Sequence, residues 1–167
     1  MPESDFPRDA DCIARGTPAG PGREHSPPDK HHPLHDGYRN GEQVPPREGE
    51  TSDVLMAVAL EWIGKQAAGK KPFLAVIWFP SPHGPHVATP EYAAPYAKYG
   101  KAKANYYGEL AGVDHGMGQL RKALRDLEIA DNAMLWFCSD NGGAFPLSTG
   151  GLPGGKKWLT EGGTSVA

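Results

Sequence analysis

The stretch Ser139-Asp-Asn-Gly-Gly143 combines residue types that bind hard cations. Asp140 offers an anionic oxygen and Asn141 a neutral carbonyl oxygen, and both suit Ca²⁺ or Mg²⁺. The same residue types favour turns, so the stretch taken alone is better explained as a simple turn. It directly follows the short apolar run 133–138, and ligands of open α/β sheets bind where strands end. A metal site and a turn are therefore both open at this point.

Two histidines stand three residues apart in the proline-rich stretch Pro80-Ser-Pro-His-Gly-Pro-His86. Three prolines and a glycine exclude a helix here. A backbone this stiff fixes the directions of His83 and His86, which suits a binding site. The alternative is a proline-stiffened surface loop whose histidines are incidental.

Lys156 stands in a glycine-punctuated tail, residues 150–167. Glycines allow a close approach of the backbone to a ligand, and a lysine can place a point charge on an oxyanion. The stretch is not a phosphate-binding Walker A loop, because the spacing differs and no Ser or Thr follows the lysine. The competing interpretation is an ordinary solvated lysine.

Four segments are predicted to position these residues. Residues 53–67 carry a wide apolar face after a Thr51-Ser52-Asp53 helix cap, and a second helix of about twenty residues begins near Lys103. Residues 72–79 and 133–138 are apolar without alternation, which is typical of strands covered on both faces. The second helix is recognised by a regular stripe of Tyr106, Leu110, Val113, Met117, Leu120, Leu124 and Leu127.

Strand, long helix and strand form a βαβ unit, whose two strands run parallel. Both strands then end at one edge of the sheet, one in the two histidines and the other in Asp140 and Asn141. The topology favours one site over two unrelated loops. Asp114, beside the stripe of the second helix, is interpreted as a polar neighbour rather than a ligand.

The composition sets further bounds. The chain has 167 residues, 22 glycines and 17 prolines, and a net charge of −3 that does not suggest nucleic acid as a partner. No apolar run is long enough for a membrane span, and the first residues do not form a secretory signal. Residues 1–50 are predicted to be loop-rich or disordered, with residues 51–167 as the folded domain. The histidines of this first segment lack zinc spacing (His25, His31, His32 and His35).

Two cysteines provide no disulfide framework. Cys12 stands in the loop-rich segment, and Cys138 is predicted to be a buried strand residue. Neither thiol indicates a cellular compartment.

Taken together, the motifs resemble those of the sulfatases of the alkaline-phosphatase-like superfamily. Four stretches carry the resemblance across residues 37–167, and they occur in the order found in the family. They are Lys71-Pro-Phe-Leu with Pro82-His-Gly-Pro-His86, Val113-Asp-His-Gly-Met-Gly118, Ser139-Asp-Asn-Gly-Gly143, and Gly154-Gly-Lys with Glu161-Gly-Gly163. The resemblance implies a partial α/β sulfatase fold with a mostly parallel sheet and flanking helices.

The resemblance also implies roles for single residues. Asp140 and Asn141 correspond to Ca²⁺ ligands, Lys156 to the lysine that holds the sulfate, and His83 to the histidine near the sulfate and the leaving oxygen. His86 is a further candidate for substrate binding. These groups would neutralise the charge that develops on a sulfate ester, and His83 would hydrogen-bond the ester or assist departure of the alcohol.

Some family features have no counterpart here. The Cys- or Ser-x-Pro-x-Arg motif that yields the formylglycine nucleophile is absent, as is the aspartate pair of the first strand that completes the Ca²⁺ site. The match also frays after Gly163, where the usual arginine and proline are missing. The chain is therefore expected to be a fragment of a sulfatase, marginally folded and inactive alone, whose parent hydrolyses aryl or carbohydrate sulfate esters.

Two other functions stay open. The chain is alternatively a non-catalytic remnant or a binding subunit that docks on a partner, or part of a phosphate-ester hydrolase of the same superfamily. Sulfatases are often exported, so the resemblance is compatible with a periplasmic or extracellular parent, although no residue of the chain indicates a compartment.

Overall fold

The structure, a computed structural model, describes residues 13–14, 35–39, 42–69, 71–144 and 149–165. It divides into two compact units, residues 1–131 and 132–167. Cys12, His25, His31 and His32 lie outside the described residues, so the interpretation of the early histidines is not tested. No helix within the described ranges is long and apolar enough to span a bilayer.

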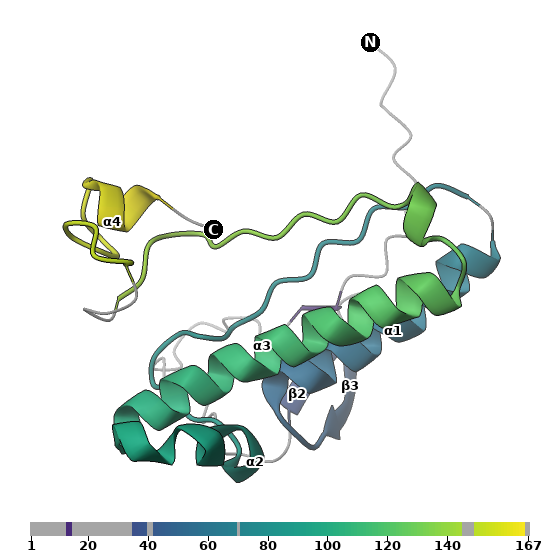
Figure 1. Cartoon of the computed structure of the whole chain (residues 1–167). Helices are drawn as coiled ribbons and strands as arrows, with labels where there is room; N and C mark the ends of the chain where they lie inside the picture. Colours follow the sequence, from purple (N-terminus) through teal and green to yellow (C-terminus); the bar gives the residue numbers. More distant parts are fainter. Residues whose placement is uncertain (1–12, 15–34, 40–41, 70, 145–148, 166–167) are drawn as a thin grey trace. The chain divides into compact units, whose positions relative to one another are not determined.

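Two long helices form the main body of the first unit (Figure 1). Helix α1 spans Thr51–Ala68 and helix α3 spans Lys101–Asp126, so both predicted helices are confirmed. Their apolar faces meet in a core of Met56, Ile63 and Leu120, against which further side chains pack, among them Trp62, Ile77, Phe79, Met117 and Leu124. The helical spacing therefore identifies the faces that pack, although the apolar face of α3 was expected to lie on a sheet and, among the described residues, lies on α1.

The predicted cap of α1 is wrong. The residue before the helix is Glu50, with extended backbone angles and no side-chain capping bond. The chain is already helical at Thr51, and Ser52 is wholly buried rather than placed at the end. Glu50 is itself buried, for a reason that becomes clear at the site below.

Short helical turns join the proline-rich loop to α3. Helix α2 spans Pro90–Ala93 and the 3-10 helix η1 spans Ala94–Tyr99, while η2, Ala130–Asn132, follows α3. Glycines of α3 let these neighbours approach closely: a Cβ atom built on Gly108 would lie 2.6 Å from the Cβ atom of Ala88. This close approach fixes the path of the chain just after the two histidines.

A three-stranded antiparallel sheet precedes α1, with strand order β1-β2-β3. Its strands are β1 (Ile13–Ala14), β2 (His35–Arg39) and β3 (Glu42–Arg47), and Tyr38 pairs with Gln43 in the β2–β3 ladder. The strands lie in the segment that the composition predicts to be loop-rich.

The predicted parallel sheet is not observed in the described residues. Residues 72–79 and 133–138 are not assigned as strands, and the described backbone shows no hydrogen bond from either segment to a partner. A strand needs a neighbour that pairs with its N–H and C=O groups. Most of the apolar side chains that were expected to be buried are accordingly exposed, for example Trp78 at 84% and Trp136 at 82%, although Ile77 and Phe79 pack against the helical core. Cys138, predicted to be buried, is exposed as well.

In the second unit, residues 132–141 lead into a compact set of loops that ends in α4, Glu161–Thr164. Backbone hydrogen bonds between these loops take the place of a side-chain core. This unit carries Asp140, Asn141 and Lys156.

Candidate functional site

The loop that carries His83 leaves the extended segment 72–79 at Pro80. A turn forms there, because the backbone N–H of His83 donates to the carbonyl oxygen of Pro80 at 3.2 Å. The imidazole of His83 is exposed, and its Nδ1 lies 2.7 Å from the carbonyl oxygen of Gly84. A carbonyl only accepts hydrogen bonds, so this contact places a proton on Nδ1. Nε2 is then the acceptor atom of the neutral ring.

His86 has different surroundings. Its Nδ1 lies 3.1 Å from Oε2 of Glu109, and its side chain is 16% exposed. The ring of Tyr106 meets the imidazole edge to face, with 5.1 Å between the ring centroids. His86 is thus held from two sides by helix α3.

Sequence reasoning did not single out Glu109, although a signal exists. Glu109 is three residues after Tyr106 and four before Val113, so helical spacing places it on the buried side of α3. Its side chain is 1% exposed, and Oε1 accepts the backbone N–H of Val87 at 2.8 Å. A buried carboxylate needs such partners, and an acidic residue within an apolar stripe is the pattern that indicates them.

Glu50 is a second buried carboxylate at this loop. Its Oε2 accepts the backbone N–H of Thr89 at 3.3 Å. Burial raises the pKa of the Glu50 carboxyl, and the negative charge of Glu109 raises it further, while the bond from Thr89 acts in the opposite direction. The segment after His83 is therefore tied down at two points by carboxylates.

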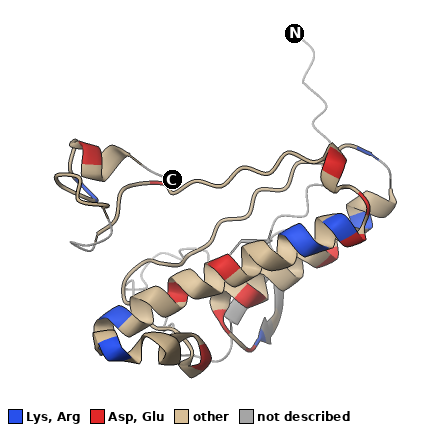
Figure 2. Ribbon diagram, in the orientation of Figure 1, with Lys and Arg blue, Asp and Glu red and all other residues tan. Residues whose placement is uncertain are grey.

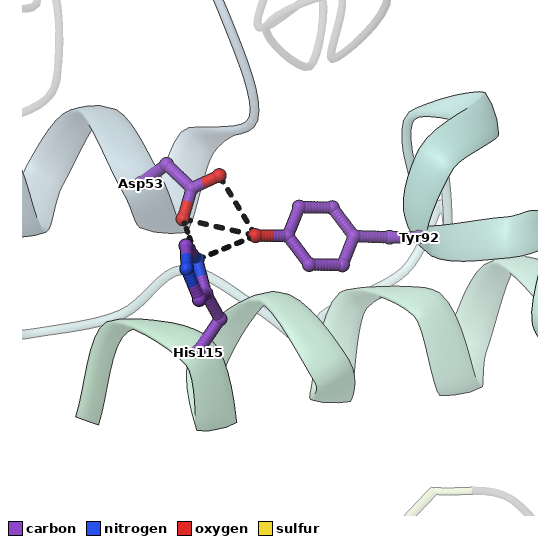
Figure 3. A network of polar contacts seen from close by, with 3 residues as sticks. All are labelled: Asp53, Tyr92 and His115. Atoms are coloured by element: carbon purple, nitrogen blue, oxygen red, sulfur yellow. Dashed lines mark hydrogen bonds and ion pairs between the residues drawn. The ribbon is translucent and has the colours of Figure 1, made fainter. Parts of the chain in front are cut away.

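A third polar cluster joins α1, α2 and α3 (Figure 3). The hydroxyl of Tyr92 lies 2.9 Å from Oδ2 of Asp53 and 2.7 Å from Nδ1 of His115, and that nitrogen lies 2.9 Å from Oδ1 of Asp53. Burial raises the pKa of the Tyr92 phenol, and the hydrogen bond to Asp53 adds to the effect. The neutral phenol is therefore a stable donor that links three helices.

The cavity beside this cluster does not suit an anion. It measures about 560 Å³, and four acidic residues, Glu48, Glu50, Asp53 and Glu91, outnumber the one basic residue, Arg47, in its wall. Such a wall repels a sulfate ester. The residues that the sequence predicts to bind sulfate, His83, His86 and Lys156, do not line this cavity.

In the second unit, three glycine-rich motifs close on one another. The backbone N–H of Gly142 donates to the carbonyl oxygen of Gly163 at 2.9 Å, and that of Lys156 donates to the carbonyl oxygen of Gly143 at 3.0 Å. A Cβ atom built on Gly142 would lie 1.9 Å from the carbonyl oxygen of Gly162, so only glycine fits. These bonds bring the Asp-Asn-Gly-Gly loop and Lys156 together, although they are separated by more than ten residues.

The side chains that would do chemistry stand on this backbone frame. Asp140 is exposed, while Asn141 and Lys156 are half-buried. The hydroxyl of Ser139 donates to the main-chain oxygen of Asn141 at 2.8 Å, which shapes the loop. The structure thus gathers Asp140, Asn141 and Lys156 in the second unit, and His83 and His86 in the first.

The donor set fits Ca²⁺ in type and falls short in number. A carboxylate and an amide oxygen are hard ligands, but Ca²⁺ takes six to eight oxygens. Among the described residues no group of three His, Cys, Asp or Glu side chains is placed to hold a metal ion. Asp140 and Asn141 therefore provide part of a coordination shell at most.

The sequence model of the sulfatase family matches residues 19–166. Among curated proteins, the chain is 29% identical to an uncharacterized sulfatase, YdeN, of Escherichia coli, over 76% of this chain and 23% of that protein. It is also 29% identical to the N-acetylgalactosamine-6-sulfatase of Canis lupus familiaris, over 70% of this chain and 22% of that protein.

Solved structures agree with this comparison. Ps i-CgsB in complex with k-i-k-neocarrahexaose matches with a TM-score of 0.71 and 30% identity, over 78% of this chain and 30% of that one. A sulfatase structure from Bacteroides fragilis, yidJ, matches at 22% identity with a TM-score of 0.56, which supports the fold alone. The chain spans less than a quarter of the length of the two curated relatives. The family model covers most of the chain, and the chain belongs to the sulfatase family.

Proposed function

We propose that the protein containing this chain is a sulfatase that hydrolyses sulfate monoesters of phenols or carbohydrates. The observation that carries the proposal is the backbone closure of the second unit, because it joins the predicted metal ligands to the predicted sulfate-binding lysine. The names of two curated relatives, an uncharacterized sulfatase and an N-acetylgalactosamine-6-sulfatase, point to the same reaction class.

In this proposal, Lys156 binds a sulfate oxygen with its ammonium group, and Asp140 and Asn141 contribute oxygens to a Ca²⁺ site. Ca²⁺ supplies charge neutralisation at the sulfate when it is bound. His83 contacts the ester oxygen: because Nδ1 donates to the carbonyl oxygen of Gly84, Nε2 of the protonated ring donates a hydrogen bond to the ester oxygen and passes its proton to that oxygen as the alcohol departs. His86 is kept as a substrate-binding candidate on the same loop.

The nucleophile is expected to be a formylglycine that residues 1–167 do not supply, since no stretch of this sequence matches the formylglycine motif. We therefore expect no appreciable turnover from residues 1–167 alone. Purified residues 1–167 that hydrolyse an aryl sulfate in a Ca²⁺-dependent way would contradict this.

The decisive test compares two neighbouring lysines in the full-length product of the gene. Lys156 is half-buried beside the Gly143 loop, and Lys157 is exposed. Lys156→Met should lower the turnover of an aryl sulfate by roughly 10²–10³-fold, the usual effect of removing one oxyanion contact. Lys157→Met, which removes the same charge one residue away, should change it by less than about twofold, since exposed charges contribute little.

Equal effects of the two substitutions would refute the role of Lys156. The same assay separates the phosphate-ester alternative: faster hydrolysis of an aryl phosphate, restored by Zn²⁺ rather than Ca²⁺ after chelation, would favour that reaction.

A second candidate function follows from the extended segment 72–79. Ile77 and Phe79 pack against the core, whereas Leu74, Val76 and Trp78 are 64–84% exposed. An apolar outer face of this kind supports the alternative of a non-catalytic subunit that docks on a partner. Co-purification of a stoichiometric partner with a complex that turns over no sulfate ester would favour it.

A further inference from the structure

The loop of His83 is held from the helical side by two buried carboxylates. Glu109 of α3 is 1% exposed and Glu50, just before α1, is 7% exposed. Each accepts a backbone N–H from the segment that follows His83, Glu109 from Val87 and Glu50 from Thr89. Figure 2 shows acidic residues in the middle of α3 and basic residues toward its two ends, with Asp126 as an acidic residue at the C-terminal end.

Of the two, Glu109 is bound more completely. Its Oε1 accepts from Val87 at 2.8 Å and its Oε2 contacts Nδ1 of His86 at 3.1 Å, whereas the bond from Thr89 to Glu50 is longer, at 3.3 Å. A buried carboxylate with both oxygens bonded is a specific anchor, since loss of either partner leaves a costly polar group.

The same contact determines the proton on His86. An ionised carboxylate only accepts hydrogen bonds, so Nδ1 of His86 must be the donor. The ring of Tyr106 packs on the imidazole and restricts its rotation. The geometry therefore selects one tautomer of His86 and one ring orientation, three residues after His83.

We propose that Glu109 is a positioning residue for His83: it fixes the tautomer of His86 and the Val87 backbone, and thereby sets the loop that presents His83. The link to catalysis rests on the proposed sulfatase function, in which His83 contacts the ester. The tautomer of His86 and the response of the loop do not depend on that function.

The test is nuclear magnetic resonance of the chain labelled with ¹⁵N-histidine. In the wild type, neutral His86 should carry its proton on Nδ1. Glu109→Gln keeps an oxygen for Val87 but turns the other group into an N–H₂ donor, so His86 should switch to the tautomer protonated on Nε2. The ring resonances of His83 should shift in the same variant.

Glu91→Gln is the matched control, because Glu91 is an exposed carboxylate on α2 near the same loop. It should leave the resonances of both histidines unchanged. A contact that only stabilises the fold would switch the tautomer of His86 and leave the His83 resonances unchanged, so the His83 resonances test positioning directly.

Two results would overturn the proposal. One is that the neutral His86 of the wild type is protonated on Nε2. This result needs no variant, so it tests the proposal even if Glu109→Gln fails to fold. The other is a switched His86 in Glu109→Gln with unchanged His83 resonances. If Lys156→Met and His83→Ala both left the hydrolysis of a sulfate ester unchanged in the full-length protein, the proposed function would be wrong. The conclusion about the tautomer of His86 would remain valid.

Discussion

Replacing Gly108 with alanine tests how closely helix α3 approaches the chain that follows the two histidines. The added methyl group would lie 2.6 Å from the Cβ atom of Ala88 and 3.0 Å from the backbone carbon of Tyr92. Gly118, on the same helix, is the control, because nothing lies within 4 Å of a Cβ atom built there. The two substitutions are chemically identical and differ only in their surroundings.

The magnitude follows from two contributions. Glycine to alanine inside a helix stabilises by about 0.5–1 kcal/mol, and this gain is the same at both positions. At Gly108, overpacking against backbone costs about 1–3 kcal/mol. The propensity gain cancels in the comparison, so the free energy of unfolding of Gly108→Ala should be lower than that of Gly118→Ala by about 1–3 kcal/mol.

Urea unfolding followed by circular dichroism at 222 nm measures this difference, since helices supply most of the signal. Gly118→Ala should shift the midpoint to higher urea than the wild type, and Gly108→Ala should not. If both variants gained the same stability, the close approach of α2 to α3 would be wrong, and with it the fixed path of the loop behind His83.

Three further predictions rest on named contacts. The raised pKa of Glu50 means that the folded state favours the neutral carboxyl. The stability that this group contributes is therefore present below its ordinary pKa of 4.5 and is lost as the pH rises through the folded value. Glu50→Gln should weaken this decrease in the free energy of unfolding, measured by urea unfolding at several pH values. Tyr92→Phe removes the hydrogen-bond donor to Asp53 and should lower the free energy of unfolding by roughly 1–3 kcal/mol, measured by thermal unfolding. The control, Tyr99→Phe, should lower it by less than about 0.5 kcal/mol, because the side chain of Tyr99 is half-exposed. Trp78→Lys should lower dye binding and self-association in light scattering, because the indole is 84% exposed on an extended segment, and unchanged association would contradict a role for that face.

The helices were predictable because their signal is local. The spacing of residues such as Val113, Met117 and Leu120 describes one face of α3 whatever lies beyond it, and that face does pack on α1. The apolar runs 72–79 and 133–138 differ from the helices, because whether they form strands depends on other segments that pair with them. A strand exists only with a paired neighbour, and the described residues include none for either run, so the sequence predicts buried strands where the structure has extended segments with exposed side chains.

The site shows the same division. Asp140, Asn141 and Lys156 were recognised as candidates from their types, and their motifs do meet, because backbone bonds through glycines join them. Glu109 was missed because its role depends on Val87 and His86, more than twenty residues earlier in the chain. Such a pairing is visible only when two segments lie together in space. Its only trace in the sequence is one acidic residue on an otherwise apolar helical face.

The two units hold their candidate site residues by different kinds of contact, and this difference bears on the proposed function. In the second unit, backbone hydrogen bonds join the motifs, together with the hydroxyl of Thr160, which donates to the carbonyl oxygen of Pro153 at 2.7 Å. No described hydrogen bond engages the side-chain ends of Asp140, Asn141 or Lys156. These three side chains are therefore available to bind a cation and an anion, as the proposed function requires. In the first unit, the loop is held by side chains, and His86 is engaged by Glu109. An imidazole held in this way is suited to fixing its neighbour, and His83, which is exposed beside it, is the histidine that we propose contacts the substrate.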